Sequence, residues 1–517
     1  MAQTPDTEPV TDAGSGTYGE IVRSSALIGG SSALNMGLSL IRTKVFALIL
    51  GPTGFGLFGI YRSIASLAEC LASLGINTSG VRQIAHAAGS DDSEQVGRTA
   101  TVMRATSIVL GIVGTALLVL FSRPVSRITF GDNAHAGAIS LLSIAVFYEL
   151  VAYGYGALIQ GKRHVADLAR VAVWGALLGT ALAIPFVYFL GEKGIVPSIV
   201  SVSATSLAVS WWYGRRVKIE KPSMTLVQIQ HEASELLNLG IVFMATYLIT
   251  AGVAYAVRIF LLRENGLAAA GFYQSAWTLG GFYVGFILDA MGADFYPRLT
   301  GHCDDHATFN RMVNEQTQVG LLLAGPGVLA TLSIAPLVIE LLYSSKFGAS
   351  VGVLRWILLG TMLQVVNWPM GYMIIAKGRQ ALYFATEFAY GLAYLGLAWI
   401  CVRAYGLNGA GIAFFGGNLV HGLILYPVVH RLSGFGWSTA SVRRIALFFT
   451  LVAMGFSSFY LLPAAWAYAV GTVAALFTAW YSIRELMALV SWSGLPRPVR
   501  KILGALLRRR QDQTDTA

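Results

Sequence analysis

Seven basic side chains lie inside apolar stretches of this sequence. They are Arg42, Lys44, Arg62, Arg104, Arg170, Arg258 and Arg355. A charge near the middle of a bilayer costs roughly 2.5–3.5 kcal/mol on insertion scales, so each retained charge is a functional hypothesis. A guanidinium group binds two phosphate oxygens at once through parallel hydrogen bonds. Arg42, Arg62 and Arg258 therefore predict an anion-binding site. The alternative is a long side chain that snorkels to the nearest membrane surface.

Helical spacing places several of these charges beside other polar groups. Ser31, Asn35 and Arg42 share one helical face, which favours a cavity lining with Asn35 as a further binding residue, whereas Lys44 faces elsewhere and is interpreted as snorkelling. The longest polar stripe consists of Arg62, Ser66, Glu69, Ser73 and Asn77. This stripe predicts either a cavity wall or a buried Arg–Glu pair that joins two helices.

Carboxylates inside apolar runs are fewer. Asp289 follows Gln274, Thr278 and Gly285 at helical spacing and predicts a deep carboxylate. If transport is coupled to a proton or a sodium ion, Asp289 and Glu69 are the candidate coupling groups. The alternative for Asp289 is a counter-ion for an arginine. A further set, Tyr383, Glu387, Tyr390 and Tyr394, lines one face of a later run and is interpreted as part of an interfacial aromatic belt.

The composition defines the elements that must hold these residues. Of 517 residues, 55% are hydrophobic and only 12% charged, against roughly 25% charged in soluble domains. The mean hydropathy is +0.63. We therefore expect an all-α polytopic membrane protein. Cys70, Cys303 and Cys401 have no metal-type spacing, and the loops carry no nucleotide fingerprint, so we expect no metal, no cofactor, no nucleic-acid partner and no enzymatic activity.

Apolar runs of about 20 residues predict fourteen membrane spans. The expected spans are 24–50, 54–79, 100–121, 136–160, 166–190, 195–213, 236–262, 271–296, 317–343, 351–376, 381–402, 409–429, 444–461 and 465–487. Lys and Arg residues in the connecting segments number 23 on the side of the N-terminus and 6 on the other side. The positive-inside rule therefore places both termini in the cytoplasm of a multi-pass protein of a bacterial inner membrane.

The sequence repeats weakly at an offset of 215 residues. Gly51 pairs with Gly266 and Gly191 with Gly406 at this offset, and Glu149 falls on Gln364. Six spans restore the starting orientation, so the repeat predicts two parallel, pseudo-symmetric lobes. The predicted organisation is a disordered cytoplasmic N-terminus (1–23), an N-lobe (24–214), an inter-lobe loop (215–235), a C-lobe (236–431), a C-terminal helix pair (432–490) and a basic interfacial tail (491–517).

Several segments look like the recurring motifs of one family. They are LGPTGFGLFG at Leu50–Gly59, LGINTSGVRQIA at Leu74–Ala85, AGFYQSAWTL at Ala270–Leu279, YPRL at Tyr296–Leu299, APLVIELLYSSKFGAS at Ala335–Ser350, AKGRQ at Ala376–Gln380 and YGLNGAGIA at Tyr405–Ala413. Over residues 24 to 430 the sequence resembles the O-antigen and polysaccharide flippases of the multidrug/oligosaccharidyl-lipid/polysaccharide exporter superfamily.

This resemblance implies a function and a set of partners. It implies a two-lobed fold with a cationic cavity and the flipping, by alternating access, of an undecaprenyl-pyrophosphate-linked oligosaccharide (an O-antigen or exopolysaccharide repeat unit) from the cytoplasmic to the outer leaflet. Membrane lipids, a polysaccharide polymerase, glycosyltransferases and H⁺ or Na⁺ coupling are the expected partners. A cation-coupled multidrug antiporter and a peptidoglycan-precursor flippase of the same superfamily remain the alternatives, the latter because two spans follow the usual twelve.

Overall fold

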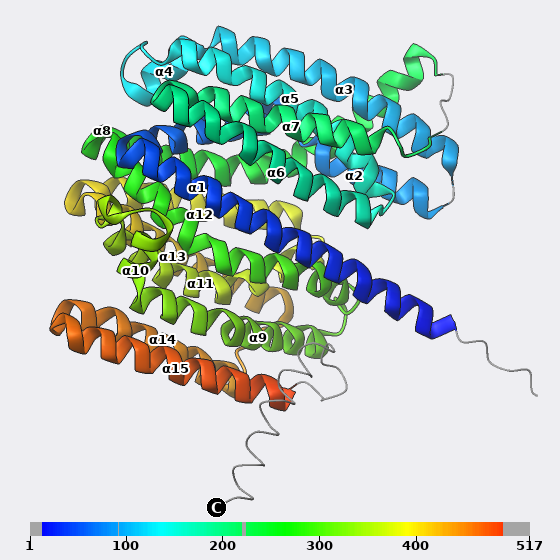
Figure 1. Cartoon of the computed structure of the whole chain (residues 1–517). Helices are drawn as coiled ribbons and strands as arrows, with labels where there is room; N and C mark the ends of the chain where they lie inside the picture. The colour runs from blue at the N-terminus through cyan, green and yellow to red at the C-terminus, as the bar shows by residue number, and fades with distance from the viewer. Residues whose placement is uncertain (1–12, 91, 220–223, 490–517) are drawn as a thin grey trace, which may run out of the picture. The chain divides into compact units, whose positions relative to one another are not determined.

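The computed structural model describes residues 13–90, 92–219 and 224–489, and in these ranges the chain is helical and without strands (Figure 1). The helices are α1 (Ala13–Ser73), α2 (Ile76–Gly89), α3 (Ser93–Leu120), α4 (Ser122–Phe130), α5 (Ala136–Gly161), α6 (Val165–Leu190), η1 (Gly191–Gly194), α7 (Ile195–Gly214), α8 (Leu226–Thr300), α9 (His306–Ser333), α10 (Ala335–Leu342), η2 (Ser345–Phe347), α11 (Ser350–Ala376), α12 (Gln380–Tyr405), α13 (Leu407–Ser433), α14 (Thr439–Leu461) and α15 (Ala464–Leu489). The all-α polytopic class is confirmed.

Within the described part of the chain, nine helical stretches are long and apolar enough to cross a membrane. A tenth is counted if α9 and α10, which meet at an 83° bend, form one broken span. Three of the nine stretches are 45, 50 and 58 residues long. At a rise of about 1.5 Å per residue, each is long enough for two crossings of a hydrocarbon core of about 30 Å. The count of fourteen spans stays a prediction.

The two longest helices break at glycines that are 215 residues apart. Gly51 in α1 has φ 63° and ψ −173°, and Gly266 in α8 has φ 83° and ψ 176°. This backbone region is essentially restricted to glycine, because a Cβ atom would be strained there. The same offset relates Gly191 to Gly406, both with φ 57°, and it relates the bounds of α6 to those of α12. The repeat expected from the sequence is therefore present in the backbone.

The start of α9 shows how the sequence sets helix ends. Asp305 accepts hydrogen bonds from the backbone N–H groups of Ala307 (3.1 Å) and Thr308 (3.2 Å), and Asp92 caps α3 in the same way. Hydrogen bonds from Thr308 lower the pKa of Asp305. An aspartate before the first turn satisfies free N–H groups of the helix. Both halves of the repeat thus have an aspartate N-cap at the start of these helices.

The chain divides into two compact units. Unit 1 comprises Met1–Gln274 with Leu342–Phe347, and unit 2 comprises Ser275–Leu341 with Gly348–Ala517. The first half of α8 therefore groups with unit 1 by its contacts, whereas the predicted C-lobe began at residue 236. The predicted lobes divide the chain by membrane crossings and remain a prediction.

Two predicted segments between and beyond the lobes lie partly or wholly outside the described residues. In the predicted loop 215–235, helix α8 already begins at Leu226. Thr225 and Gln228 form a reciprocal capping box there, in which Thr225 N–H donates to Gln228 Oε1 (2.9 Å) and Gln228 N–H to Thr225 Oγ1 (3.4 Å). The predicted basic tail 491–517 lies outside the described residues, as do residues 1–12 of the predicted N-terminal segment.

In unit 1, α5 packs between α3 and α7, and the figure shows α3, α5 and α7 running side by side (Figure 1). Glycines let α1 and α8 approach closely. A Cβ atom at Gly56 would overlap the Leu267 carbonyl oxygen, and one at Gly271 would overlap the Pro52 carbonyl oxygen. Small residues permit such backbone contacts between membrane helices. This contact fixes α8 against the part of α1 that carries the polar stripe.

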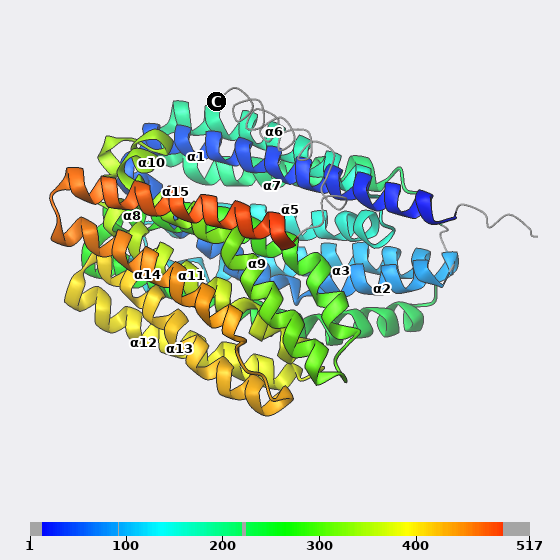
Figure 2. The ribbon, with the colours of Figure 1, turned by 90° about the horizontal axis from the view of Figure 1, so that it is seen from below.

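In unit 2, α11 and α12 both pack against α13, and α14 and α15 form an antiparallel pair that lies on α9 (Figure 2). Arg444 on α14 joins the pair to the bundle, because it donates hydrogen bonds to Gln318 of α9 and to Glu485 of α15. The ring of Phe448 fills the space beside Gly325 of α9. These helices correspond to the last two predicted spans.

Candidate functional site: two pockets on helix α1

Arg42 and Arg62 line one small pocket of about 40 Å³ in unit 1, named here the cationic pocket. Its walls are Arg42, Phe46, Phe58, Arg62, Ala183, Ser198, Ile199 and Val202. Arg42 is partly exposed and Arg62 is exposed. None of the described residues that form these walls is acidic. The pocket therefore combines two guanidinium groups with an otherwise apolar lining, a combination that suits an anion carrying an apolar or neutral part.

The break at Gly51 creates this pocket. Arg42 and Arg62 are twenty residues apart, a distance that a straight helix would stretch to about 30 Å. Because α1 breaks between them, the two arginines line the same pocket, whose other walls include residues of α6 and α7. Their charges act on each other, and like charges held together favour an anion between them. The sequence predicted that both arginines face a cavity, and the structure brings these two together.

Asn35 has a different position. It lies on α1, is exposed, and is not among the residues that line the cationic pocket. Seven residues separate it from Arg42, which is about 10 Å along a helix. Its role in binding stays a prediction.

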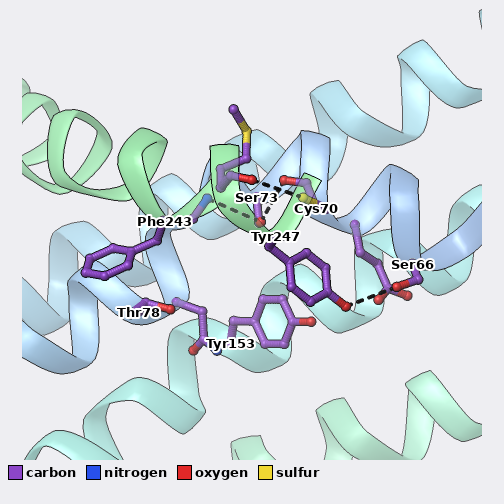
Figure 3. A pocket seen from close by; sticks show the side chains of 11 residues that line it. Ser66, Cys70, Ser73, Thr78, Tyr153, Phe243 and Tyr247 are labelled. Carbon is purple, nitrogen blue, oxygen red and sulfur yellow. Dashed lines mark hydrogen bonds between the residues drawn. The ribbon is translucent and has the colours of Figure 1, made fainter. Parts of the chain in front are cut away.

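A second pocket, named here the carboxylate pocket, lies further along α1 and has a volume of about 260 Å³ (Figure 3). It is lined by Ser66, Glu69, Cys70, Ser73, Gly75, Asn77, Thr78, Tyr153, Phe243, Met244 and Tyr247. Ser66 Oγ and Tyr247 OH lie 3.2 Å apart at its mouth, and the Tyr153 ring lies beneath Tyr247 in the figure. Glu69 is only 8% exposed, and its buried Oε1 has no hydrogen-bond partner.

The predicted polar stripe lines these pockets, with one correction to its helix. Arg62 faces the cationic pocket, while Ser66, Glu69, Ser73 and Asn77 face the carboxylate pocket. The prediction of one span over 54–79 was wrong, because α1 ends at Ser73 and Asn77 belongs to α2. The chain turns at Leu74 (φ 47°) and Gly75 (φ 72°). A Cβ atom at Gly75 would overlap the Gly240 carbonyl oxygen of α8, so only glycine fits this turn.

Glu149 on α5 joins the carboxylate pocket electrostatically. Its charge interacts with those of Glu69 and Arg62. In the sequence, the repeat pairs Glu149 with Gln364. It gives no information on whether Glu149, on α5, lies near Glu69, on α1. A pair of intramembrane glutamates close to an arginine is the feature that sequence reasoning missed.

Arg258 is buried and already paired. It is 6% exposed. Its Nε donates to Gln274 Oε1 (3.0 Å), and its Nη1 donates to the Ala254 carbonyl (2.8 Å). The Gln274 side chain in turn packs on Gly59 of α1. The structure does not place Arg258 among the walls of the cationic pocket, although it lies in the same unit, so its role as a third substrate-binding arginine stays a prediction.

Asp289 lies in unit 2, on the second half of α8, where its side chain is exposed. It acts electrostatically on Tyr372 of α11. Glu69 and Asp289, the two candidate coupling groups, therefore belong to different units. Among the described residues there is no group of three or more His, Cys, Asp or Glu side chains that could hold a metal ion.

Long apolar helices in two compact units that repeat one helix order define a polytopic membrane protein, and one of its units contains charged pockets. Solved structures share this fold. A multidrug resistance MATE family transporter of the MOP superfamily, in an inward-facing conformation, matches with a TM-score of 0.66 and 18% identity, covering 77% of this chain and 95% of its own. The lipid II flippase MurJ, in an inward closed conformation, matches with a TM-score of 0.67 and 13% identity, covering 88% and 98%.

The chain belongs to the family of polysaccharide biosynthesis proteins, because the family model matches residues 45–352. It is 24% identical to the lipid III flippase of Escherichia coli (strain K12) over 415 residues, which cover 78% of this chain and 96% of that protein. The resemblance that the sequence motifs indicated is confirmed. The protein is therefore a multi-pass membrane protein of the polysaccharide biosynthesis family.

Proposed function

We propose that the protein flips an undecaprenyl-pyrophosphate-linked oligosaccharide, the repeat unit of an O-antigen or exopolysaccharide, from the cytoplasmic to the outer leaflet of a bacterial inner membrane. The observation that carries this proposal is the cationic pocket, where Arg42 and Arg62 lie together without an acidic neighbour among its described walls. A pyrophosphate diester presents several oxygens that two guanidinium groups bind bidentately. Family membership and the similarity to a lipid III flippase support the same substrate class.

The proposed mechanism uses the pocket for the head of the substrate. The Arg42 and Arg62 guanidiniums bind the pyrophosphate and replace its hydration, while the apolar wall from Phe46 and Phe58 contacts the adjoining part of the lipid. The oligosaccharide follows through the polar space beyond, and the site is exposed to one leaflet and then to the other. No bond is made or broken in this transport, so the protein acts as a transporter and not as an enzyme.

The carboxylate pocket favours a second candidate, a cation-coupled multidrug antiporter. Glu69 and Tyr247 could receive an organic cation between a carboxylate and an aromatic ring. The two candidates differ in the charge of the pocket that carries transport. An anionic substrate requires Arg42 and Arg62, whereas a cationic one requires Glu69. A peptidoglycan-precursor flippase would use the same arginines and differ only in the glycan.

A reconstitution experiment separates these candidates. Purified protein in liposomes is supplied with a fluorescent undecaprenyl-pyrophosphate oligosaccharide, and movement between leaflets is followed by quenching from outside. We expect flipping by the native protein and its loss in Arg42→Ala and Arg62→Ala. Uptake of ethidium with no movement of the lipid, abolished by Glu69→Gln and retained in the arginine variants, would replace the flippase with the antiporter. Glycosyltransferases and a polysaccharide polymerase are then the expected partners on the two sides of the membrane.

A further inference from the structure

Unit 2 contains a pair of titratable side chains that face each other between two membrane helices. Glu387 lies on α12 and His421 on α13, and the distance from His421 Nε2 to Glu387 Oε1 is 3.6 Å. Both are largely buried, with 16% and 13% of their side chains exposed. His421 Nε2 is buried and makes no hydrogen bond. The pair lies about 10 Å from the start of α12 and about 18 Å from the end of α13, well inside the helices.

The groups around the pair are aromatic hydroxyls and one amide. The His421 ring stacks on Tyr390 with centroids 4.5 Å apart, and Tyr383, four residues before Glu387 on α12, interacts with it electrostatically. Tyr390 in turn stacks on Tyr394 of the same helix.

From α11, Tyr372 acts electrostatically on Tyr383, and Asn367 lies beside Gly422, the residue that follows His421. Asp289 of α8 acts on Tyr372. The stripe of Tyr383, Glu387, Tyr390 and Tyr394, which the sequence attributed to an interfacial belt, therefore surrounds a buried polar centre.

The charge of this pair depends on a single proton. With one proton the pair is neutral overall, either as carboxylate with imidazolium or as carboxylic acid with imidazole. Without that proton it leaves one buried negative charge, and with a second proton it carries one buried positive charge. Burial in a low dielectric disfavours both charged states. The two groups therefore titrate as one unit that holds and releases one proton.

We infer that Glu387 and His421 form a proton-binding site in unit 2 that couples transport to the proton gradient. This inference rests on the proposed flippase function for its coupling role, but not for the binding of the proton. When the site is open to the outside, the carboxylate and neutral imidazole accept one proton. When it is open to the cytoplasm, the pair releases that proton there. No redox step or other co-reactant is involved.

The chemistry of the pair selects a proton over a sodium ion. Hard cations prefer several oxygen ligands, whereas this site offers one carboxylate and an imidazole nitrogen, which is a ligand for protons and softer metals. Serine, threonine and backbone carbonyl ligands would indicate sodium. Of the coupling groups expected from the sequence, Glu69 lines the carboxylate pocket of unit 1 and Asp289 lies on α8 in unit 2, so neither belongs to the pair.

The first experiment measures proton binding without any substrate. Infrared difference spectra of the reconstituted full-length protein are recorded between pH 5 and 8. We expect a protonated carboxyl band that disappears in Glu387→Gln and whose midpoint moves in His421→Gln. Glu340→Gln, which removes an exposed glutamate of α10 in the same unit, should leave the band unchanged. Glu69 and Glu149 are carboxyl groups of unit 1, so only the component lost in Glu387→Gln reports the pair, and a difference spectrum that Glu387→Gln leaves unchanged overturns the proton site.

The second experiment measures coupling with the fluorescent undecaprenyl-pyrophosphate oligosaccharide. For one proton per cycle, each pH unit of gradient shifts the leaflet distribution tenfold, since one unit is equivalent to 1.36 kcal/mol. We expect this shift in the native protein and in Glu340→Gln, and none in Glu387→Gln or His421→Gln, while an imposed sodium gradient has no effect.

A normal tenfold shift in both pair variants overturns the coupling role and leaves the flippase function intact. A native protein that shows the infrared band but moves no lipid contradicts the proposed function and retains the proton site. The two failures are therefore distinguishable.

Discussion

Arg42 and Arg62 are separated by twenty residues of one helix, yet they line the same pocket, because the helix breaks at Gly51 between them. This relationship joins a backbone feature to the binding chemistry. The two guanidinium groups lie on separate arms of a broken helix and share a pocket with residues of α6 and α7, so the spacing between the charges depends on the angle of the break. Residues that set that angle should matter as much as the arginines themselves.

The first prediction concerns the arginines. Arg42→Ala and Arg62→Ala should each lower the flipping rate about 10- to 100-fold, since a hydrogen-bonded charge contributes roughly 1.5–3 kcal/mol. Arg→Lys should retain part of the activity, because lysine keeps the charge and loses the paired geometry. Lys44→Ala is the matched control, and it should be milder because Lys44 does not line the pocket. Native flipping in both alanine variants at equal protein levels would contradict the cationic site.

The second prediction concerns the break itself. Gly51→Ala should destabilise the protein by about 1–3 kcal/mol and reduce flipping, because a side chain is strained at this backbone conformation. Space is not the cause, since nothing lies within 4 Å of a Cβ atom built there. Gly37→Ala is the control on the same helix, with equal space and ordinary helical backbone. It should be neutral or stabilising by up to about 1 kcal/mol. Thermal unfolding in detergent, read beside the flipping assay, measures both effects.

The arginines and the glycine break show which features could be predicted from the sequence. The membrane class, the repeat and the exposure of Arg42 and Arg62 to a cavity followed from apolar runs, glycine offsets and helical spacing, because those signals are local. The meeting of Glu69 with Glu149, and of Glu387 with His421, could not be predicted, since each pair joins two helices whose mutual rotation is set by packing. The burial of Arg258 against Gln274 was missed for the same reason.

The third prediction separates structure from binding at Arg258. Arg258→Ala should lower the unfolding temperature, because it leaves Gln274 and the Ala254 carbonyl without their buried donor. Arg42→Ala should not lower it, since Arg42 is partly exposed in the pocket. If Arg258 instead binds substrate, its alanine variant keeps the native unfolding temperature and loses flipping. Measurement of both quantities on the same preparations decides between these outcomes.

The fourth prediction concerns topology. If there are fourteen spans with both termini inside, reporter fusions at Asp132, Asn265 and Asn408 should report the outer side, and a fusion at Asp304 should report the cytoplasm. The excess of basic residues on the N-terminal side motivates this orientation. A fusion at Pro463, between α14 and α15, should again report the outer side. A cytoplasmic signal at Pro463 alone would show that the last helix pair does not cross the membrane as two spans.

The last prediction concerns the energy source. A substrate with about two negative charges gains roughly 4–5 kcal/mol per 100 mV when it moves outward from a negative interior. A membrane potential alone should therefore drive flipping in liposomes that have no pH or sodium gradient. Glu69→Gln should keep this voltage-driven component, because it leaves the Arg42 and Arg62 charges in place. Asp289→Asn should also keep it, since Asp289 lies in unit 2. Collapse of the potential with valinomycin at equal potassium should remove the outward excess and leave the labelled lipid equally distributed between the leaflets, in the native protein and in both variants. An equal distribution that is the same with and without an inside-negative potential would show that the transported species carries no net charge and would remove the anionic head from the proposed mechanism.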